Sequence, residues 1–326
     1  MSARLRRALH GTAAALLLAG CGRAPDGKLA LAINWKPEPE FGGLYEALRR
    51  GAFAKRGLDV TVTGGPGAPV VQMVEAGQAS FGVAAADEVV LARDRGTDVV
   101  AVFATYQTNP QGIMVHASRK LGSLAELFAA GGTLAVEPGL PYVKWLRKRY
   151  DLARMKLVPY GYSIAPFLTD LNFAQQVFIT AEPIQARRQG ADPQVFLIAD
   201  SGFDPYAAVY ITSGRRLREE PARVAAFAAA LRDGWRGYLD DPAPANAVMG
   251  AKNREMDAET FRLAAEAQRP LIETGFTREN GLGAMSLERW TDLGKQLQEL
   301  ALVDRAPEAA RCFVDPERLV GAGAPR

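Results

Sequence analysis

The chain has 326 residues, of which 48% are hydrophobic and 8% aromatic, as in an ordinary globular protein with a large core. Its formal net charge is +3, but residues 1–20 hold three of the 39 basic residues and none of the 36 acidic ones, so the remainder is neutral. This balance argues against nucleic-acid binding, and two cysteines and two histidines are too few for a metal cluster. We expect no nucleic-acid partner, no metal and no other cofactor.

The N-terminus has the pattern of an export signal. Three arginines precede the apolar run 13–19, and small residues lead into Cys21. The run is shorter than the about 20 apolar residues of a membrane-spanning helix. The Leu-Ala-Gly-Cys ending resembles a bacterial lipobox, in which the cysteine is acylated; the alternative is a plain signal peptide with an incidental cysteine. We predict a signal peptide over 1–20, lipidation at Cys21, a linker over 21–27, and a lipid-anchored protein outside the cytoplasm.

The first part of the mature chain alternates between strand and helix patterns. Short apolar runs, often β-branched, predict strands, and longer amphipathic segments predict helices between them. Asp87 follows the third strand and is a candidate N-cap for the next helix. The expected strands are 28–34, 58–63, 80–85 and 99–105, and the expected helices are 43–55, 70–76 and 91–95.

A second unit with the same alternation follows, and the C-terminal third is mainly helical. Ser123 is the expected N-cap of the first helix of this unit. The expected strands are 112–116, 133–136, 156–159, 176–180, 195–199 and 207–212, and the expected helices are 125–130, 142–150, 165–171, 222–238, 257–271 and 287–300.

Strands that are apolar on both faces and separated by helices are typical of parallel sheets flanked by helices. In such sheets ligands bind beyond the carboxyl ends of the strands. The length that remains after the signal suggests two lobes rather than one core. The sequence therefore predicts an α/β protein whose functional residues follow strand ends.

Several motifs resemble those of periplasmic solute-binding proteins of ABC importers, in the branch related to thiamine-pyrimidine-precursor binders and sulfonate binders. The first, NWKPEPEFGGLYEA, together with VEAGQASFGV, is fairly specific for this branch, and the resemblance covers most of 28–240. The matching segments are 34–47, 74–83, 86–88, 107–112 and 181–183.

The resemblance implies the two-lobed periplasmic-binding-protein fold of type II, with a ligand held between lobes joined by a hinge. Each lobe would be a mostly parallel sheet flanked by helices. The first lobe would comprise 28–111 and 209–326, and the second lobe 112–208. Such a protein is not an enzyme, and we expect a monomer that delivers its small-molecule ligand to the permease and ATPase subunits of an importer.

Candidate ligand contacts of the first lobe follow its first strand. Trp35 could stack on a flat heteroaromatic ring, or pack between the lobes. The backbone N–H groups at Gly43 could hold an anionic or carbonyl group, or the glycine could serve only the turn. Glu40 is a loop charge or a ligand contact, and Tyr45 reaches either the site or the core. Asp87 lies in a matching motif at another strand end.

The second lobe offers aromatic and acidic candidates at corresponding strand ends. Glu182 could accept hydrogen bonds from an aminopyrimidine or an amide, and the resembled family keeps an acidic residue there. Gly139 lies in the Glu-Pro-Gly segment after another strand, and Tyr142 opens the helix that follows. Tyr160 and Tyr162 add aromatic surface but are weaker candidates.

Tyr106, Gln107 and Tyr206 lie where the chain should cross between the lobes, and hinge or site-floor roles suit them. From these residues we predict capture of a small planar heterocycle, such as a thiamine-pathway pyrimidine or a flavin, for import. The alternative ligand is a small anion such as a sulfonate or nitrate, which the lack of an arginine at the strand ends disfavours. A sensor could replace the permease as partner. An enzyme resembling the intracellular pyrimidine synthase of the wider family is disfavoured, because its cysteine-rich motif and active-site histidines are absent from the sequence.

Overall fold

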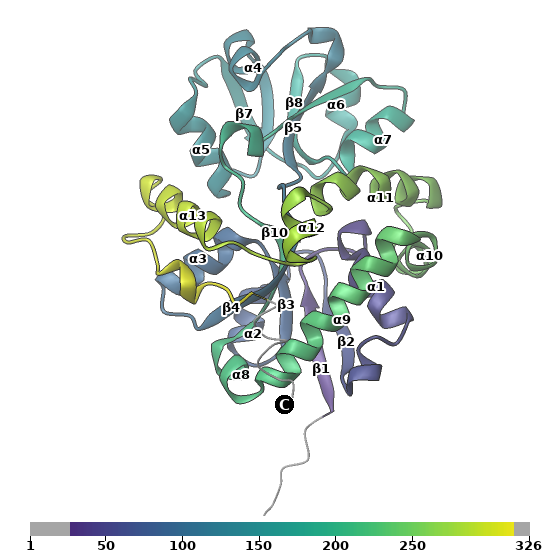
Figure 1. Cartoon of the computed structure of the whole chain (residues 1–326). Coiled ribbons are helices and arrows are strands. Elements are labelled where there is room, and N and C mark those ends of the chain that lie inside the picture. The colour runs from purple at the N-terminus through teal and green to yellow at the C-terminus, as the bar shows by residue number, and fades with distance from the viewer. Residues whose placement is uncertain (1–26, 316–326) are drawn as a thin grey trace, which may run out of the picture.

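The computed structural model describes residues 27–315, which form two β-sheets of five strands each, with helices around both (Figure 1). We call sheet A with the helices packed on it half A, and sheet B with its helices half B. The predicted signal peptide and Cys21 lie outside the described residues. Within those residues, no helix is long and apolar enough to cross a membrane.

Sheet A has the strand order β2-β1-β3-β10-β4. β1 pairs in parallel with β2 and β3, whereas β10 is antiparallel to both of its neighbours. The prediction of a mostly parallel sheet is thus confirmed, with one reversed strand. The strands are β1 (Lys28–Ile33), β2 (Asp59–Gly64), β3 (Phe81–Ala84), β4 (Val99–Tyr106) and β10 (Ala207–Ser213).

Sheet B repeats this arrangement with the order β7-β6-β8-β5-β9. Here β6 pairs in parallel with β7 and β8, and β5 is the reversed strand. In both sheets the reversed strand is the one that follows a crossing of the chain from the other sheet. The strands are β5 (Gln111–His116), β6 (Gly132–Val136), β7 (Met155–Pro159), β8 (Phe173–Phe178) and β9 (Pro193–Leu197).

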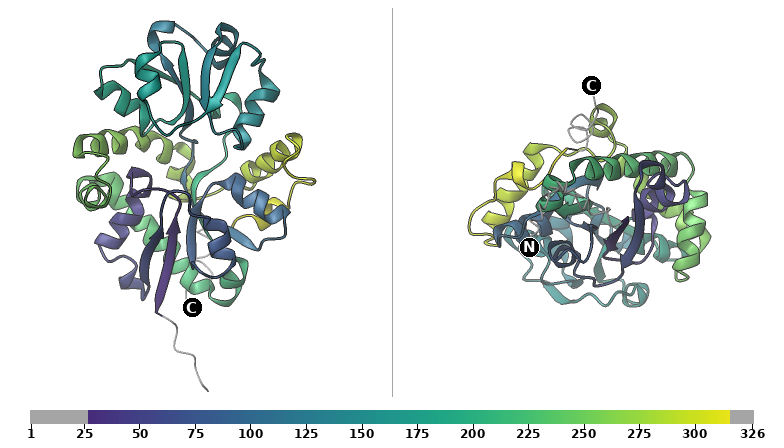
Figure 2. Two further views of the ribbon diagram at one scale, coloured as in Figure 1. Left: turned by 180° about the vertical axis from the view of Figure 1, so that it is seen from behind. Right: turned by 90° about the horizontal axis from the view of Figure 1, so that it is seen from below.

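Half A carries most of the helices, and the chain returns to it after β9 (Figures 1 and 2). Half B carries α4 (Leu124–Ala130), α5 (Pro141–Arg149), α6 (Ala165–Thr169) and α7 (Glu182–Arg188). The remaining helices are α1 (Gly42–Arg49), α2 (Val70–Glu75), α3 (Ala86–Asp94), α8 (Gly214–Glu219), α9 (Pro221–Asp240), α10 (Ala243–Lys252), α11 (Ala258–Ile272), α12 (Gly275–Asn280) and α13 (Leu287–Glu299), with short 3-10 turns η1 (Pro39–Phe41), η2 (Ala54–Arg56), η3 (Ala117–Arg119), η4 (Ala199–Ser201) and η5 (Ala309–Arg311).

The chain crosses between the two sheets twice, at 107–110 and at 198–206. Hydrogen bonds tie the two crossings together, because the Asn109 amide donates to Asp204 Oδ1 at 2.7 Å. Arg289 of α13 also donates to the Asp204 carbonyl at 2.8 Å. The two crossings therefore form one braced connection. The proposed division into lobes at 111/112 and 208/209 stays a prediction.

The expected and observed elements differ at several places. The helix expected over 43–55 ends at Arg49, and a separate 3-10 turn follows. Ala85, not Asp87, is the N-cap of α3, because the helix begins at Ala86 and Glu88 accepts a hydrogen bond from the Ala85 amide at 2.7 Å. The strand expected to run to 180 ends at Phe178, and Glu182 begins α7 instead. The predicted Ser123 cap is confirmed, since its Oγ accepts from the Glu126 amide.

The close packing of α1 on α9 explains why positions 42 and 43 are glycines. A Cβ on Gly43 would lie 2.3 Å from the Trp235 ring, and one on Gly42 would lie 2.3 Å from the Tyr238 ring. Both rings are buried and pack edge to face against each other, so they have no room to retreat. The two glycines let α1 approach α9 closely. This close packing fixes the loop between β1 and α1.

We predict that Gly43→Ala destabilises the protein by about 1–3 kcal/mol, because overpacking forces α1 away from α9. Gly275→Ala, at the open first position of α12, is the matched control, since no atom lies within 4 Å of its added Cβ. Urea denaturation of the two variants measures the difference. Equal midpoints for both would contradict the packing explanation.

Candidate functional site

The candidate site lies where residues that follow the parallel strands of both sheets approach one another. Trp35 follows β1 of half A, whereas Tyr162 follows β7 and Glu182 follows β8 of half B. The carboxyl ends of parallel strands are where ligands bind in open α/β sheets. The two halves therefore face each other with the edges that this fold uses for binding.

An aromatic contact joins the two halves. The rings of Trp35 and Tyr162 lie 6.0 Å apart between centroids and are tilted by 31°. Tyr160 continues the group, with its ring 5.1 Å from that of Tyr162. Tyr162 is 62% exposed and has a φ of +53°. Residues other than glycine rarely adopt this left-handed conformation, and those that do are frequently found at functional sites. The three rings offer flat apolar surface from both halves.

Glu38 lies next to Trp35 in the same loop. The Trp35 indole Nε1 donates to Glu38 Oε1 at 3.2 Å, and Asn253 donates to the same oxygen at 3.4 Å. Burial and, to a smaller extent, the negative charge of Glu182 in half B together raise the pKa of Glu38 from 4.5 to about 7. The two carboxyls are thus close enough to interact although they come from different sheets.

Glu40, in the 3-10 turn before α1, has an even more perturbed carboxyl. Burial, followed by the charges of Glu38 and Glu182, raises the pKa of Glu40 to about 8. Among residues 27–315 its carboxyl has no hydrogen-bond or ion-pair partner. The Tyr210 hydroxyl is fully buried, is also without a partner in this part of the chain, and has its pKa raised by burial and by Glu40. The half-buried Glu40 carboxyl is therefore available to another polar group.

The turn that carries Glu40 is held by a buried amide. Gln268 of α11 donates from Nε2 to the Pro39 carbonyl at 2.9 Å, and its Oε1 accepts from the Tyr106 hydroxyl at 2.7 Å. Gln268 is completely buried. Burial raises the pKa of Tyr106 well above 10, and nearby Glu40 adds to the effect. Tyr106 thus supports the Glu40 turn through Gln268.

Glu182 is fixed at the first position of α7. Its Oε1 accepts from the Tyr160 hydroxyl at 2.7 Å, and its Oε2 accepts from the Phe178 amide at 2.9 Å. Burial raises the pKa of Glu182, and the two hydrogen bonds partly offset this rise. The carboxylate is therefore held in one orientation by two hydrogen bonds.

A second polar group of half B consists of Glu137, Gln176 and Tyr142. The Tyr142 hydroxyl and the Glu137 amide both donate to Gln176 Oε1 at 2.7 Å, and Gln176 Nε2 donates to Glu137 Oε1 at 2.9 Å. The negative charge of Glu137 raises the pKa of Tyr162. This network orients the loop after β6 next to the aromatic group.

The three carboxyls of Glu38, Glu40 and Glu182, which we call the acidic cluster, have little positive charge near them. Lys36 lowers the pKa of Glu38, but its ammonium forms an ion pair with Glu255. The cluster can therefore accept hydrogen bonds from N–H groups or hold a cation, and it repels an anion.

The structure brings together three of the predicted ligand contacts, Trp35, Glu40 and Glu182, and Tyr106 is linked to the Glu40 turn through Gln268. The sequence does not single out Glu38 as a ligand contact, and it makes Tyr160 and Tyr162 only weak candidates. The usable signal for Glu38 was the pair of glutamates two positions apart in a proline-bracketed loop at a strand end. The roles of all these residues in binding stay predictions.

The other predicted contacts have packing partners or lie outside the cluster. Gly43 faces Trp235, and Tyr45 is 4% exposed within the core of half A. Their buried positions follow from the close packing of α1, which the sequence pattern did not reveal. Gly139 is exposed in the loop after β6, with no atom within 4 Å of an added Cβ.

Gln107 and Tyr206 belong to the two crossings. Gln107 is buried and donates from Nε2 to the Ala284 carbonyl at 3.1 Å. The Tyr206 hydroxyl accepts from the Ser286 amide at 3.0 Å, and the Arg289 guanidinium lies 4.0 Å from its ring centroid. Asp87 is half-buried near the start of α3, and burial raises its pKa to about 7. The first two side chains are thus used in bracing the connection.

These features define a class of protein. Two mixed five-stranded sheets with a doubly crossed connection form the periplasmic-binding-protein fold, and solved structures confirm it. The aliphatic sulphonate-binding protein SsuA of Escherichia coli matches with a TM-score of 0.69 at 14% identity, covering 89% of this chain and 92% of that one. SsuA of Xanthomonas axonopodis pv. citri, bound to MOPS, matches with a TM-score of 0.65 at 13% identity, covering 89% and 99%.

The family follows from the sequence comparison. The model of the NMT1/THI5-like family matches residues 38–245, and the chain belongs to that family. The formylaminopyrimidine-binding protein of Halalkalibacterium halodurans is 24% identical over 273 residues, which are 80% of this chain and 82% of that protein. The riboflavin-binding protein RibY of Chloroflexus aurantiacus is 23% identical over 307 residues, which are 88% and 85% of the two chains.

The raised pKa values predict that the unliganded protein loses stability as the pH rises. Unfolded glutamates titrate near 4.5, whereas Glu38 and Glu40 titrate at about 7 and about 8 when folded. The folded chain therefore binds more protons between these values, and the stabilisation present below pH 4.5 is lost as the pH rises to about 8. Urea unfolding between pH 5.5 and 8.5 should show this fall.

The double variant Glu38→Gln/Glu40→Gln should lack that part of the fall, because its amides do not titrate. Glu279→Gln, on the exposed end of α12, should keep the slope of the parent protein. A double variant with the parent's slope would refute the assignment of the raised pKa values to these carboxyls.

Proposed function

We propose that this protein is the extracytoplasmic solute-binding component of an ABC importer and captures a small planar heterocycle that carries N–H donors. The observation that carries the proposal is the aromatic contact of Trp35 with Tyr162, placed beside an acidic cluster drawn from both halves. The pyrimidine and riboflavin ligands in the names of two relatives are rings of this kind.

The ring of the ligand would stack on the aromatic group. An aromatic contact of this kind contributes about 0.5–1.5 kcal/mol beyond the area that it buries. Trp35 is half-buried and comes from half A, while Tyr162 comes from half B, so a ring inserted between them would touch both halves at once. Stacking would thus favour the closed arrangement of the two halves.

The acidic cluster would select the edge of the ring. A neutral Glu40 carboxyl can donate one hydrogen bond and accept another. The edge of an aminopyrimidine is complementary to it, because its amino group donates and its ring nitrogen accepts. Glu182 is held by Tyr160 and the Phe178 amide, and it would accept a further N–H group. Hydrogen bonds of an ionised carboxylate are the stronger ones, so this edge would set the specificity.

A small anion is the alternative ligand, and the fold likeness to sulfonate-binding proteins supports it. The charges favour the heterocycle instead. Within residues 27–315 the acidic cluster has no arginine hydrogen-bonded to it, and Lys36 is paired with Glu255. An anion would meet three carboxyls and would require all of them to be protonated.

The ligand would be delivered to permease and ATPase subunits, with the protein acting as a monomer tethered at Cys21. The lipid anchor rests on the Leu-Ala-Gly-Cys ending of the signal, and it would keep the protein close to its permease on the outer side of the cell membrane. The formylaminopyrimidine-binding protein, the riboflavin-binding protein and SsuA of E. coli are each named for a ligand that they bind, which supports binding rather than catalysis.

A thermal-shift screen of the protein should find stabilisation by a donor-bearing heterocycle. A ligand at 100 times its dissociation constant stabilises the folded state by about 2.7 kcal/mol. We expect an increase in the melting temperature with formylaminopyrimidine or riboflavin and none with an alkanesulfonate. An increase with the sulfonate alone would reject the heterocycle in favour of the anion.

Trp35→Ala and Glu40→Gln should separate stacking from edge recognition. We expect Trp35→Ala to weaken binding of the heterocycle about 10-fold, while Trp35→Phe retains most of the affinity because it keeps a flat ring. Glu40→Gln should weaken binding by a factor of about 5–10, because its amide replaces the carboxyl that pairs with the ring edge. Isothermal titration calorimetry measures both, and an unchanged dissociation constant for Trp35→Ala would remove the stacking contact from the proposal.

A further inference from the structure

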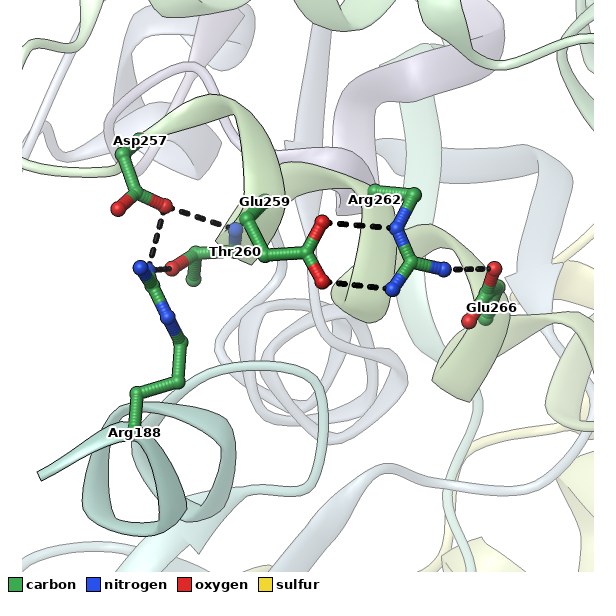
Figure 3. Close-up of polar contacts among 6 residues, drawn as sticks. All are labelled: Arg188, Asp257, Glu259, Thr260, Arg262 and Glu266. Atoms are coloured by element: carbon green, nitrogen blue, oxygen red, sulfur yellow. Dashed lines mark hydrogen bonds and ion pairs between the residues drawn. The ribbon is translucent and has the colours of Figure 1, made fainter. Parts of the chain in front are cut away.

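An ion pair outside the candidate site also joins the two halves. Arg188, the last residue of α7 in half B, reaches the N-terminus of α11 in half A (Figure 3). Its Nη1 lies 2.5 Å from Asp257 Oδ1 and also donates to the Thr260 hydroxyl. We call this contact the α7–α11 bridge. No aromatic ring or carboxyl of the candidate site takes part in it.

The bridge contacts a structurally defined point of α11. Asp257 is the N-cap of the helix, and its Oδ1 accepts from the Thr260 amide at 2.8 Å. The Arg188 guanidinium and the hydrogen bonds of Thr260 lower the pKa of Asp257 to about 2. The carboxylate is therefore charged throughout the neutral range, so the bridge does not switch with pH there. Thr260 is 3% exposed, which limits how the guanidinium can sit.

Each of the two bridged helices also holds part of the candidate site. α7 has seven residues, begins with Glu182 and ends with Arg188, so its two functional ends are only about 10 Å apart along one rigid element. α11 holds the Glu40 turn through Gln268, and its Leu271 carbonyl accepts from the Gln107 amide of the first crossing at 2.8 Å. A bond between these helices therefore affects the position of Glu182 in half B and of the Glu40 turn in half A.

We propose that Arg188 is a positioning residue for ligand capture: its bridge to Asp257 and Thr260 fixes α7 against α11 and so sets the separation of Glu182 and Tyr162 from Glu40 and Trp35. The effect on ligand affinity rests on the proposed function, whereas the effect on the separation does not. Breaking the bridge shifts the unliganded protein toward more open arrangements without unfolding either half.

Arg262 offers a matched control on the same helix. Its guanidinium bonds to both Glu259 oxygens, at 2.7 and 2.9 Å, and to Glu266, all within α11 (Figure 3). This residue has the same charge and a similar partly exposed position, but its partners do not come from half B. Removal of Arg262 changes the charge of α11 without removing a contact between the halves.

The expected effect is modest because both ends of the bridge are partly exposed. The Arg188 side chain is 38% exposed and that of Asp257 is 56% exposed. Ion pairs of this kind are weak, but a protein that interconverts between open and closed arrangements is sensitive to weak contacts that exist in only one of them. We expect a shift of this equilibrium by a factor of about 2–5.

Tryptophan fluorescence measures the separation of the halves without a ligand. Trp145, Trp235 and Trp290 are at most 2% exposed, whereas Trp35 is half-buried beside Tyr162. Acrylamide quenching of the full chain therefore reports mainly on access to Trp35. We expect Arg188→Ala and Asp257→Asn to raise the Stern–Volmer constant about twofold, Arg188→Lys to restore it in part, and Arg262→Ala to leave it at the parent value.

Asp257→Asn keeps the test valid even if Arg188→Ala folds poorly, because asparagine caps helices as well as aspartate does while losing the charge. Its melting temperature should stay within a degree or two of the parent. A Stern–Volmer constant that is unchanged in both bridge variants, or raised equally in Arg262→Ala, would overturn the proposal.

A second arm measures the dissociation constant of formylaminopyrimidine for the same variants. We expect an increase of about 2–5-fold for Arg188→Ala and Asp257→Asn and no change for Arg262→Ala. Raised quenching together with no binding of formylaminopyrimidine to any form, the parent included, would reject the proposed ligand while leaving the bridge supported. Normal affinity in the bridge variants, despite raised quenching, would overturn the positioning role.

Discussion

The structure depends on one electrostatic constraint, which is the placement of carboxyls from two separate sheets close together in a poorly solvated space. Glu38 and Glu40 come from the loop after β1, and Glu182 begins α7 in the other half. Glu182 raises the pKa of Glu38, and both raise the pKa of Glu40. Bringing the halves together therefore favours protonation of these carboxyls, or a partner that donates hydrogen bonds to them. A ligand with N–H groups meets this requirement, and an anion does not.

The fold supplies the means for this arrangement. Each sheet places its reversed strand directly after a crossing, so the parallel strands of the two halves present their carboxyl ends to one another. The braced crossings join the two halves through Asn109, Asp204 and Arg289. The α7–α11 bridge and the contact of Trp35 with Tyr162 join them elsewhere. Binding and closure can therefore act on the same few contacts.

The sequence predicted the strands and the fold class well, because buried parallel strands leave strong apolar runs and the family motifs follow their ends. It also predicted that Trp35 and Glu182 would lie at strand ends, and it offered Glu40 as either a loop charge or a ligand contact. It could not predict that Gly43 serves the packing of α1 on Trp235, because this contact joins residues about 190 positions apart. The contacts of Trp35 with Tyr162 and of Arg188 with Asp257 could not be predicted for the same reason, because the sequence around one partner does not specify the other.

Whether the acidic cluster holds protons at neutral pH can be measured directly by carbon-13 NMR of glutamate labelled at the carboxyl carbon. A titration of the unliganded protein should show two glutamates with pKa values of about 7 and about 8, which disappear in Glu38→Gln and Glu40→Gln respectively. If every glutamate instead titrates below about 5, near the value of an exposed carboxyl, the cluster is fully ionised and solvated. Selection of the ligand by protonated, poorly solvated carboxyls would then be ruled out.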